Sequence, residues 1–188
     1  PNELLGPIRT HDLSEQVLTS LAAVPNDALA AHLDTDRGDS LLTWGARHGN
    51  EEVVRILLDK GSPVDAVTER GGTALYIACQ EGHAGCVQLL LDANANVDQA
   101  NQRGITPLAV SCRNGHAQCA EMVLAAGAEV DTVLITIHTS TITAFYVACQ
   151  RGRLDCVQLL SSYGARRDRL FEADPAMTAE VVSGDNGH

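Results

Sequence analysis

Apolar residues follow a helical spacing in several short segments of this chain. Two of these segments have their apolar positions at Val53, Val54, Leu57 and Leu58, and at Val87, Leu90 and Leu91. A shorter apolar stretch precedes each segment and is separated from it by a glycine, such as Gly82, Gly115 or Gly152. Because glycine tolerates the backbone conformations of a tight turn, the pattern predicts pairs of short helices joined by turns.

The pattern returns at a constant interval along the chain. The residues Thr73, Leu75, Cys79, Gly82, His83, Cys86 and Asp98 reappear 33 residues later as Thr106, Leu108, Cys112, Gly115, His116, Cys119 and Asp131. A fixed period of this length is typical of a solenoid, in which each unit buries its apolar face only against its neighbours.

The register extends in both directions. Upstream it includes Ser40, Leu42, Gly49, Val54, Gly61 and Asp65, and downstream, after a 37-residue step, Thr143, Cys149, Gly152, Cys156, Gly164 and Asp168. Thr178 and Gly187 keep the separation of Thr73 and Gly82 and indicate a further, truncated unit. We therefore expect units at residues 38–70, 71–103, 104–140 and 141–175, with a partial unit at 176–188.

Residue types at the unit boundaries support the predicted helix pairs. Each unit opens with Ser or Thr, whose hydroxyl can cap a helix N-terminus, and Pro107 stands at a first helical position. Past the end of the second helix, four units carry Gly61, Asn94, Gly127 and Gly164, and Gly and Asn tolerate the left-handed conformation found there. An extended stretch, such as Ala95–Asp98, is expected to lead through a turn into the next unit.

On these residues the chain resembles the ankyrin repeat family. The family motif is carried by Thr106-Pro107-Leu108 and Gly115-His116, and less strictly by the openings at Thr73, Thr143 and Ser40. The His that usually follows the Leu of the motif is replaced by Thr43, Tyr76, Ala109 and Tyr146. The resemblance implies an all-α repeat solenoid of stacked helix-turn-helix units with short β-hairpin loops, spanning residues 38–188.

Residues 1–37 match the repeat poorly. The segments at residues 13–24 and 26–34 are predicted to be short amphipathic helices separated by Pro25. A degenerate capping repeat would shield the first apolar face of the solenoid, whereas an independent docking helix is the alternative. Because the first residue is Pro and the last unit is short, we interpret the chain as a fragment or processed form.

Composition narrows the functional classes. The 188 residues are 45% apolar and carry a net charge of −11, which disfavours binding to nucleic-acid backbones or anionic membranes. A local basic patch remains near Arg166, Arg167 and Arg169. No apolar run approaches the roughly 20 residues of a membrane helix. Aromatic residues make up only 3%, and Trp44, which aligns with Ile77, Val110 and Val147, is expected in the core rather than in an exposed hot spot.

Six cysteines occupy two positions of the repeat. They form the pairs Cys79 and Cys86, Cys112 and Cys119, and Cys149 and Cys156, each seven residues apart. Zinc modules place paired ligands two to four residues apart, so we expect buried free thiols, with disulfides or a metal site as alternatives. Reduced cysteines favour an intracellular location, and we expect a cytoplasmic protein, with the nucleus left open.

No catalytic constellation is evident. His83 and His116 follow turn glycines and are interpreted as hydrogen-bonding spacers between adjacent loops, while His48 and His138 are isolated. Asp65, Asp98, Asp131 and Asp168 are expected to bond to local backbone. Phosphate-binding glycine loops and nucleophile elbows are missing from the sequence, so we predict no enzyme, no cofactor and no metal.

The positions that vary between units are the candidate binding residues. Repeat-defining side chains hold the core, whereas an ankyrin stack exposes its loop tips and inner helices. The variable positions are Arg47, His48, Glu69, Arg70, Gln80, Glu81, Gln102, Arg103, Arg113, Asn114, Thr139, Gln150 and Arg151. Each is interpreted as either solvated or in contact with a partner, and together they approach the size of one side of an interface.

One segment departs from the repeat. Residues 132–142 contain four extra residues and many β-branched side chains, which favour an extended hairpin. Its apolar residues, Ile135 and Ile137 among them, either pack against neighbouring hairpins or form a projecting finger that anchors a partner. In the second case, replacing Ile135 and Ile137 by Ser should weaken partner capture without lowering the melting temperature.

The predicted function is non-enzymatic protein–protein recognition by a monomeric scaffold. A stacked solenoid loses little entropy when it binds, so a rigid surface of inner helices and loop tips suits a protein partner. Two alternatives depend on sequence beyond this chain. One is a substrate-receptor subunit of a ubiquitin ligase, and the other is the targeting module of an enzyme.

Overall fold

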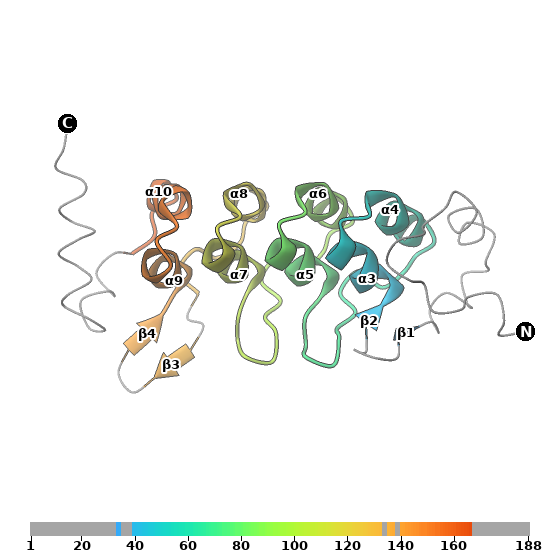
Figure 1. Ribbon diagram of the computed structural model, residues 1–188, viewed down its shortest axis with the longest axis horizontal. Coiled ribbons are helices and arrows are strands. Elements are labelled where there is room, and N and C mark those ends of the chain that lie inside the picture. The colour runs from blue at the N-terminus through green and yellow to red at the C-terminus, as the bar shows by residue number, and fades with distance from the viewer. Residues whose placement is uncertain (1–32, 35–38, 133–134, 138–139, 167–188) are drawn as a thin grey trace, which may run out of the picture.

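The computed structural model describes residues 33–34, 39–132, 135–137 and 140–166. The helices of this part are α3 (Leu41–His48), α4 (Glu51–Asp59), α5 (Ala74–Glu81), α6 (Ala84–Asp92), α7 (Pro107–Asn114), α8 (Ala117–Ala125), α9 (Ala144–Gln150) and α10 (Leu154–Ser162). They form four antiparallel pairs stacked in a row (Figure 1). This arrangement confirms the predicted all-α repeat solenoid.

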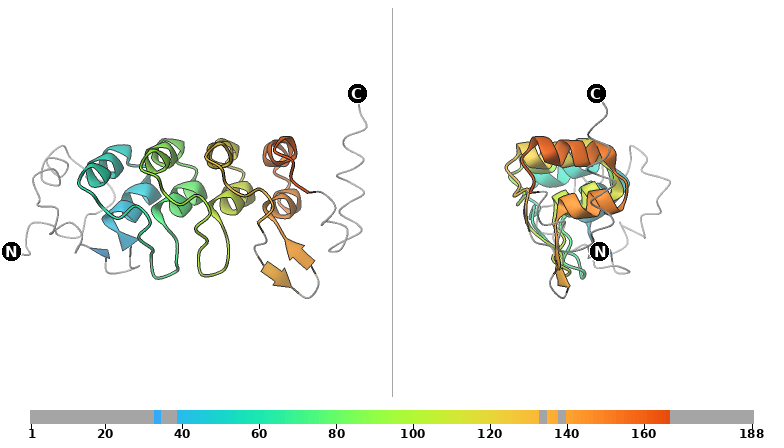
Figure 2. Two further views of the ribbon diagram at one scale, coloured as in Figure 1. Left: turned by 180° about the vertical axis from the view of Figure 1, so that it is seen from behind. Right: turned by 90° about the vertical axis from the view of Figure 1, so that its left-hand side faces the viewer.

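The stack has two helical layers. The inner helices α3, α5, α7 and α9 contact one another in sequence, and the outer helices α4, α6, α8 and α10 do the same. Viewed from the end, the two rows lie one above the other and the inter-unit loops all project from the inner row (Figure 2). The main contacts of each described helix pair are therefore with the pairs beside it, as the repeat period predicted.

Hydroxyl caps begin all four inner helices. The side chains of Ser40, Thr73, Thr106 and Thr143 accept hydrogen bonds from the amides of Thr43, Tyr76, Ala109 and Tyr146 at 3.2–3.3 Å. These bonds satisfy amides that have no partner inside the helix. The predicted caps are therefore confirmed.

Left-handed residues follow the outer helices, also as predicted. Among the described residues that are not glycine, Asn94 alone has a positive φ, at 60°. It stands where other units have Gly61, Gly127 and Gly164, with φ of 79°, 95° and 81°. The backbone conformation, rather than a side-chain contact, explains the choice of Gly or Asn at this position.

One apolar core runs through all four units. Its fully buried side chains include Leu57, Leu75, Leu90, Leu108 and Leu160. Trp44 is also buried, with 7% of its surface exposed, so the prediction that it packs in the core is confirmed. Its ring stacks at a tilt on His48, with the two ring centres 4.5 Å apart.

Short loops connect the units. The loops after α4 and α6 close with tight backbone bonds, from Gly71 N to Thr68 O at 2.8 Å and from Gly104 N to Asn101 O at 2.9 Å. The stretch Ala95–Asp98 contains a turn rather than a strand. The longer segment after α8 forms an antiparallel hairpin of β3 (Ile135–Ile137) and β4 (Ser140–Ile142), which confirms the extended hairpin predicted there.

A second hairpin precedes the first helix pair. Strand β1 (Leu33–Asp34) pairs antiparallel with β2 (Asp39–Ser40). The prediction of a helix extending to Asp34 was wrong at these two residues, since strand pairing with the start of the first unit takes precedence over their helical spacing. The other residues of the predicted N-terminal helices, and the partial unit at 176–188, lie outside the described part.

Aspartates at one repeat position join each unit to the next. Oδ1 of Asp65 accepts a hydrogen bond from Asn96 N at 2.9 Å. Asp98 accepts one from Glu129 N at 3.2 Å and Asp131 one from Arg166 N at 3.0 Å. The predicted backbone partners are confirmed for these three aspartates, but the amides are not local, because stacking brings an amide of the following unit within reach. Asp168 lies outside the described residues.

Candidate binding surface

Two sets of predicted binding residues recur along the stack, one on the inner helices and one on the loops between units. The first set, called the inner row, lies at the carboxyl ends of the inner helices and consists of Arg47, His48, Gln80, Glu81, Arg113, Asn114, Gln150 and Arg151. The second set, called the loop tips, consists of Glu69, Arg70, Gln102 and Arg103, all exposed. Because the units stack in register, each set recurs along the row.

The loop tips are tied to one another. Gln102 N donates to Arg70 O at 3.2 Å, and its side-chain Nε2 donates to Glu69 O at 2.7 Å. Gln102 therefore holds two neighbouring loops together, so its amide is already engaged. Arg103 and the side chains of Glu69 and Arg70 project from this tied pair of loops.

Some residues of the inner row also form hydrogen bonds that join neighbouring units. Asn114 Nδ2 donates to Gln80 O at 2.7 Å, across the boundary between two units. Gln80 Nε2 donates to Glu81 Oε1 at 2.8 Å, which fixes two adjacent row side chains relative to each other. These bonds limit side-chain freedom at the surface before any partner binds.

Tyr76 connects the inner row to the loop tips, and sequence reasoning missed it. The Tyr76 hydroxyl accepts a hydrogen bond from Asn101 Nδ2 at 3.0 Å. Burial raises the pKa of Tyr76, while the positive charges of Arg113 and Arg103 act to lower it. One arginine belongs to the inner row and the other to the loop tips, so both guanidinium groups lie near one aromatic side chain. The only signal in the sequence was Tyr in place of the motif His.

Arg153 was also missed. A Cβ added to Gly115 would lie 2.9 Å from Arg153 Cδ, so this arginine covers the turn that ends α7. It takes the repeat position of His83 and His116, whose rings cover Gly49 and Gly82 in the same way. Arg153 could have been predicted from this shared repeat position, because a long cationic side chain at that place must reach the preceding unit.

Histidines at this position bridge adjacent loops. The ring Nε2 of His83 lies 3.1 Å from the carbonyl oxygen of Arg47 in the preceding unit. The predicted spacer role is thereby confirmed for His83. His116 makes the equivalent ring contact over Gly82.

Three predicted binding residues lie wholly or partly outside the described part. Ile135 and Ile137 belong to strand β3, but the positions of their side chains do not. Thr139 falls outside altogether. Projection of the hairpin from the inner row, on the side of the loop tips, is visible in Figure 1. Whether its isoleucines pack inward or face a partner stays a prediction.

All six cysteines are free thiols, and all but the half-buried Cys149 are buried. Burial raises the pKa of Cys79 and Cys119, and raises that of Cys86 to about 11. Hydrogen bonding between the thiols of Cys112 and Cys156 in the next unit, followed by burial, raises the pKa of Cys112. The predicted buried free thiols are confirmed, apart from the partial exposure of Cys149.

Within the described part, no group of three or more His, Cys, Asp or Glu side chains is arranged to hold a metal ion. The same part contains no helix both long and apolar enough to cross a membrane. The polar residues that do gather form an extended surface rather than an enclosed site, which suits contact with a macromolecule.

Comparison with known families agrees with this geometry. The model of a family described as ankyrin repeats (3 copies) matches residues 14–101, 42–134 and 93–171. These overlapping matches include all four helix pairs and begin inside the poorly matching N-terminal segment. Among curated proteins, none matches the chain.

Proposed function

Since this chain belongs to the ankyrin repeat family, whose members generally mediate protein–protein interactions, we propose that it binds a protein partner through the inner row and the loop tips. The observation that carries this proposal is that the two sets approach each other at Tyr76, which lies near Arg113 of the inner row and Arg103 of the loop tips. The polar side chains of both sets differ from unit to unit, while the repeated residues hold the core. Fold alone does not specify a partner, so the surface must do so.

Binding is proposed to rely on preorganisation. The bonds from Gln102 to Glu69 O and from Asn114 to Gln80 O fix the relative positions of neighbouring units. A surface held in this way loses little conformational entropy when a partner docks, so more of the contact energy appears as affinity. No chemical step is proposed, and the ligase and enzyme-targeting alternatives gain no support from the described residues.

Blocking the surface tests the proposal. Glu81→Trp and Gln150→Trp would place bulky side chains at two exposed positions of the inner row without removing an arginine. Gln118→Trp and Gln158→Trp, at exposed positions of α8 and α10, are the matched controls on the outer row. The tagged full chain and each double variant would be used for affinity capture from a cell lysate, followed by quantitative mass spectrometry.

We expect a set of proteins that the wild-type chain and the outer-row variant retain but the inner-row variant loses. Equal thermal melting of both variants would exclude misfolding as the cause. Proteins lost from the outer-row variant and kept by the inner-row variant would refute the proposed surface.

A further inference from the structure

Charge is distributed unevenly over the described part of the chain. The inner row, the loop tips and the adjoining turn carry six arginines, Arg47, Arg70, Arg103, Arg113, Arg151 and Arg153, and two carboxylates, Glu69 and Glu81. The outer helices carry the carboxylates Glu51, Glu52, Asp59, Asp92, Glu121 and Asp155, with Arg55 their only cation. A chain with a net charge of −11 thus has one face of positive charge.

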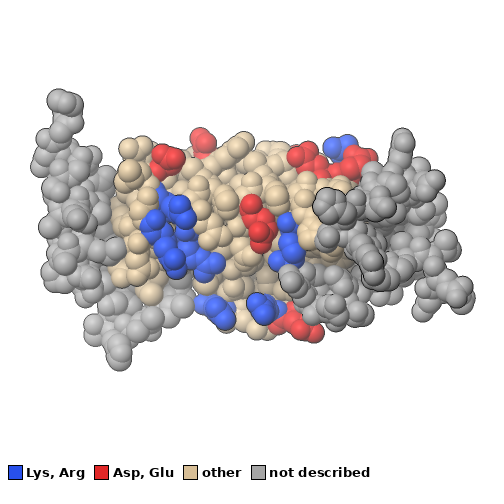
Figure 3. Space-filling model, in the orientation of Figure 1, with Lys and Arg blue, Asp and Glu red and all other residues tan. Residues whose placement is uncertain are grey.

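Figure 3 displays this segregation. Lys and Arg atoms gather over α7 and α9 and again at the loop tips, whereas Asp and Glu atoms lie mostly along the edge formed by the outer helices. We call the set Arg70, Arg103, Arg113, Arg151 and Arg153 the arginine face. A carboxylate patch interrupts the basic area in the middle of the view, and another lies beside the basic atoms at the loop tips.

Neighbouring contacts bring these arginines together. Arg153 reaches back over Gly115, two residues beyond Arg113, and Arg151 lies two residues before Arg153. Arg113 and Arg103 both lie close enough to the Tyr76 hydroxyl for their positive charges to lower its pKa. The arginine face therefore extends from the turn after α9, across the end of α7, to the loop tip before it.

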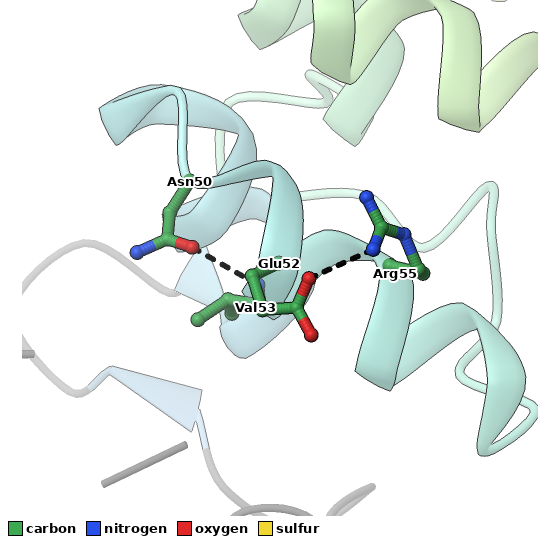
Figure 4. Close-up of polar contacts among 4 residues, drawn as sticks. All are labelled: Asn50, Glu52, Val53 and Arg55. Atoms are coloured by element: carbon green, nitrogen blue, oxygen red, sulfur yellow. Dashed lines mark hydrogen bonds and ion pairs between the residues drawn. The ribbon is translucent and has the colours of Figure 1, made fainter. Parts of the chain in front are cut away.

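The arginine face differs in its ion pairing from Arg55 and Arg166. In the described part of the chain, none of its five members forms an ion pair, whereas Arg55 pairs with Glu52 at 2.9 Å and Arg166 with Asp131 at 3.7 Å. The Arg55 pair lies on outer helix α4, where Asn50 also caps the helix by accepting from Val53 N (Figure 4). Gathering like charges on one face costs stability, so this face suits an anionic ligand.

We propose that the arginine face binds an Asp- and Glu-rich segment of a protein partner, an inference that rests on the proposed function. Guanidinium groups pair with carboxylates through two parallel hydrogen bonds, which gives geometric selectivity as well as attraction. The exposed side-chain amide of Gln150, next to Arg151 in the sequence, supplies a bond to the peptide backbone. Positive potential on one face also speeds encounter with an acidic partner at low salt.

A protein segment suits this face better than a nucleic acid. Glu69 lies beside Arg70 and Glu81 lies in the inner row, so the basic surface is interrupted by carboxylates. A nucleic acid carries a charge at every nucleotide and would place phosphates against them. An acidic peptide can instead match carboxylates to arginines and leave neutral residues beside Glu69 and Glu81.

Fluorescence anisotropy with the full chain tests the inference. The probe is a labelled peptide in which Asp and Glu alternate with neutral residues, and its control has Asn and Gln in their place. A single-stranded oligonucleotide of similar length is the third ligand. Binding is measured at about 0.05 M and about 0.5 M salt, which shortens the screening length from roughly 14 Å to roughly 4 Å. The variants are Arg113→Ala with Arg151→Ala, and the outer-helix control Arg55→Ala.

We expect the acidic peptide to bind at low salt, and its affinity to fall about tenfold at high salt and about tenfold in the Arg113→Ala, Arg151→Ala variant. The Arg55→Ala variant should bind it like the wild-type chain. Equal binding of the neutral peptide, tighter binding of the oligonucleotide, or no binding of the acidic peptide would overturn the inference. The capture experiment with the tryptophan variants has an independent outcome. A negative result with the acidic peptide therefore does not refute the proposed function.

The chain's own acidic residues provide one further control. Asp168, Glu172 and Asp174 follow the described region in sequence. If the peptide binds only after these three are replaced by Asn, the arginine face is occupied by the same chain, and the proposal of a separate acidic partner is overturned. Unchanged affinity in that variant supports it.

Discussion

Some close contacts between units join a side chain of one unit to a glycine of the unit before it. The rings of His83 and His116 lie over Gly49 and Gly82, with His116 Nδ1 only 2.5 Å from the place a Gly82 Cβ would take. Gly82 has a φ of 83°, so it is fixed both by backbone conformation and by the ring that covers it. Gly82 therefore meets two independent requirements, a left-handed backbone and the lack of a side chain under the ring of His116.

Substituting this glycine separates the two requirements. Gly127 also has a left-handed φ, of 95°, but nothing lies within 4 Å of its Cβ position. Gly127→Ala should destabilise the chain by about 1 kcal/mol through backbone strain alone, whereas Gly82→Ala should cost at least about 1 kcal/mol more because of the collision with His116. Urea unfolding measures both.

Adding His116→Ala supplies the control for this prediction. Without the ring, the cost of Gly82→Ala should fall to that of Gly127→Ala, since the pair then no longer interacts. An undiminished cost would show that the ring contact contributes nothing.

Buried thiols make stability depend on pH in the alkaline range. Burial raises the pKa of Cys86 to about 11, with the Glu51 charge adding to the effect. As pH rises above about 9, the unfolded chain releases this proton first, so stability falls until the folded pKa is reached. The loss attributable to one such thiol approaches about 1.4 kcal/mol per pH unit between those values.

Cys86→Ala should therefore flatten the fall in unfolding free energy between about pH 9 and pH 11. The neighbouring Val87→Ala removes buried apolar volume without a titrating group, so it should lower stability at every pH and leave the slope unchanged. Urea unfolding at several pH values gives both slopes. Parallel curves for the wild-type chain and Cys86→Ala would contradict the assignment.

Residues with local roles were predictable from the sequence, and residues that act between units were harder. The cap at Thr106 depends on the next three residues, and the burial of Cys79 follows from its place on a helix. The partners of Asp98 and the contacts of Tyr76 and Arg153 depend on how one unit lies on another. Candidate binding positions could be predicted from variation between repeats. The sequence did not show that some of them, such as Gln102, already form hydrogen bonds between units.

At the scale of elements, helix pairs were predicted well because capping and apolar spacing act within each pair. Leu33–Asp34 was predicted to be helical and forms a strand instead, since its pairing with Asp39–Ser40 is specified by contacts outside the segment. The four extra residues after α8 were recognised as a hairpin because β-branched side chains favour extended backbone. At the junctions between helix pairs, the side chain of an aspartate accepts a hydrogen bond from the backbone of the following unit.

One of these junctions offers a direct test. Asp98→Ala removes the acceptor of Glu129 N and should destabilise the chain by about 1 kcal/mol. Asp92 accepts from Gln88 within one exposed helix end, so Asp92→Ala should change stability by less than about 0.5 kcal/mol. The two unfolding free energies come from urea titration, and equal losses would argue against a stabilising role for the crossing bond.

At the scale of the whole molecule, the main helix contacts of the described residues join neighbouring helix pairs. Stability in such an array is approximately a sum of terms for units and for the interfaces between them. A unit whose length equals the repeat period should therefore be removable, because the units on either side meet with the same residues. In this chain the second and third units keep the 33-residue register.

Deleting residues 71–103 should leave a folded chain with lower stability. His116 would then cover Gly49 in place of His83. Glu129 N would face Asp65 in place of Asn96 N, because each replacement lies one repeat further along the chain. Urea unfolding should stay cooperative, with an m-value reduced by about a quarter because less surface is exposed. Deleting residues 78–106 instead would join Ile77 to Pro107 inside a helix, and that chain should not fold. Similar behaviour of both deletions would contradict the register argument.

The dependence of each helix pair on its two neighbours alone has a mechanical consequence. When the molecule is stretched between its ends, tension reaches the interior only through successive junctions, and the weakest junction yields without loosening distant ones. Extension should then proceed in separate steps, each releasing one pair, and reverse in the opposite order when the tension drops. A partner that spans several pairs would act as a splint, so its presence would be felt as a stiffer spring.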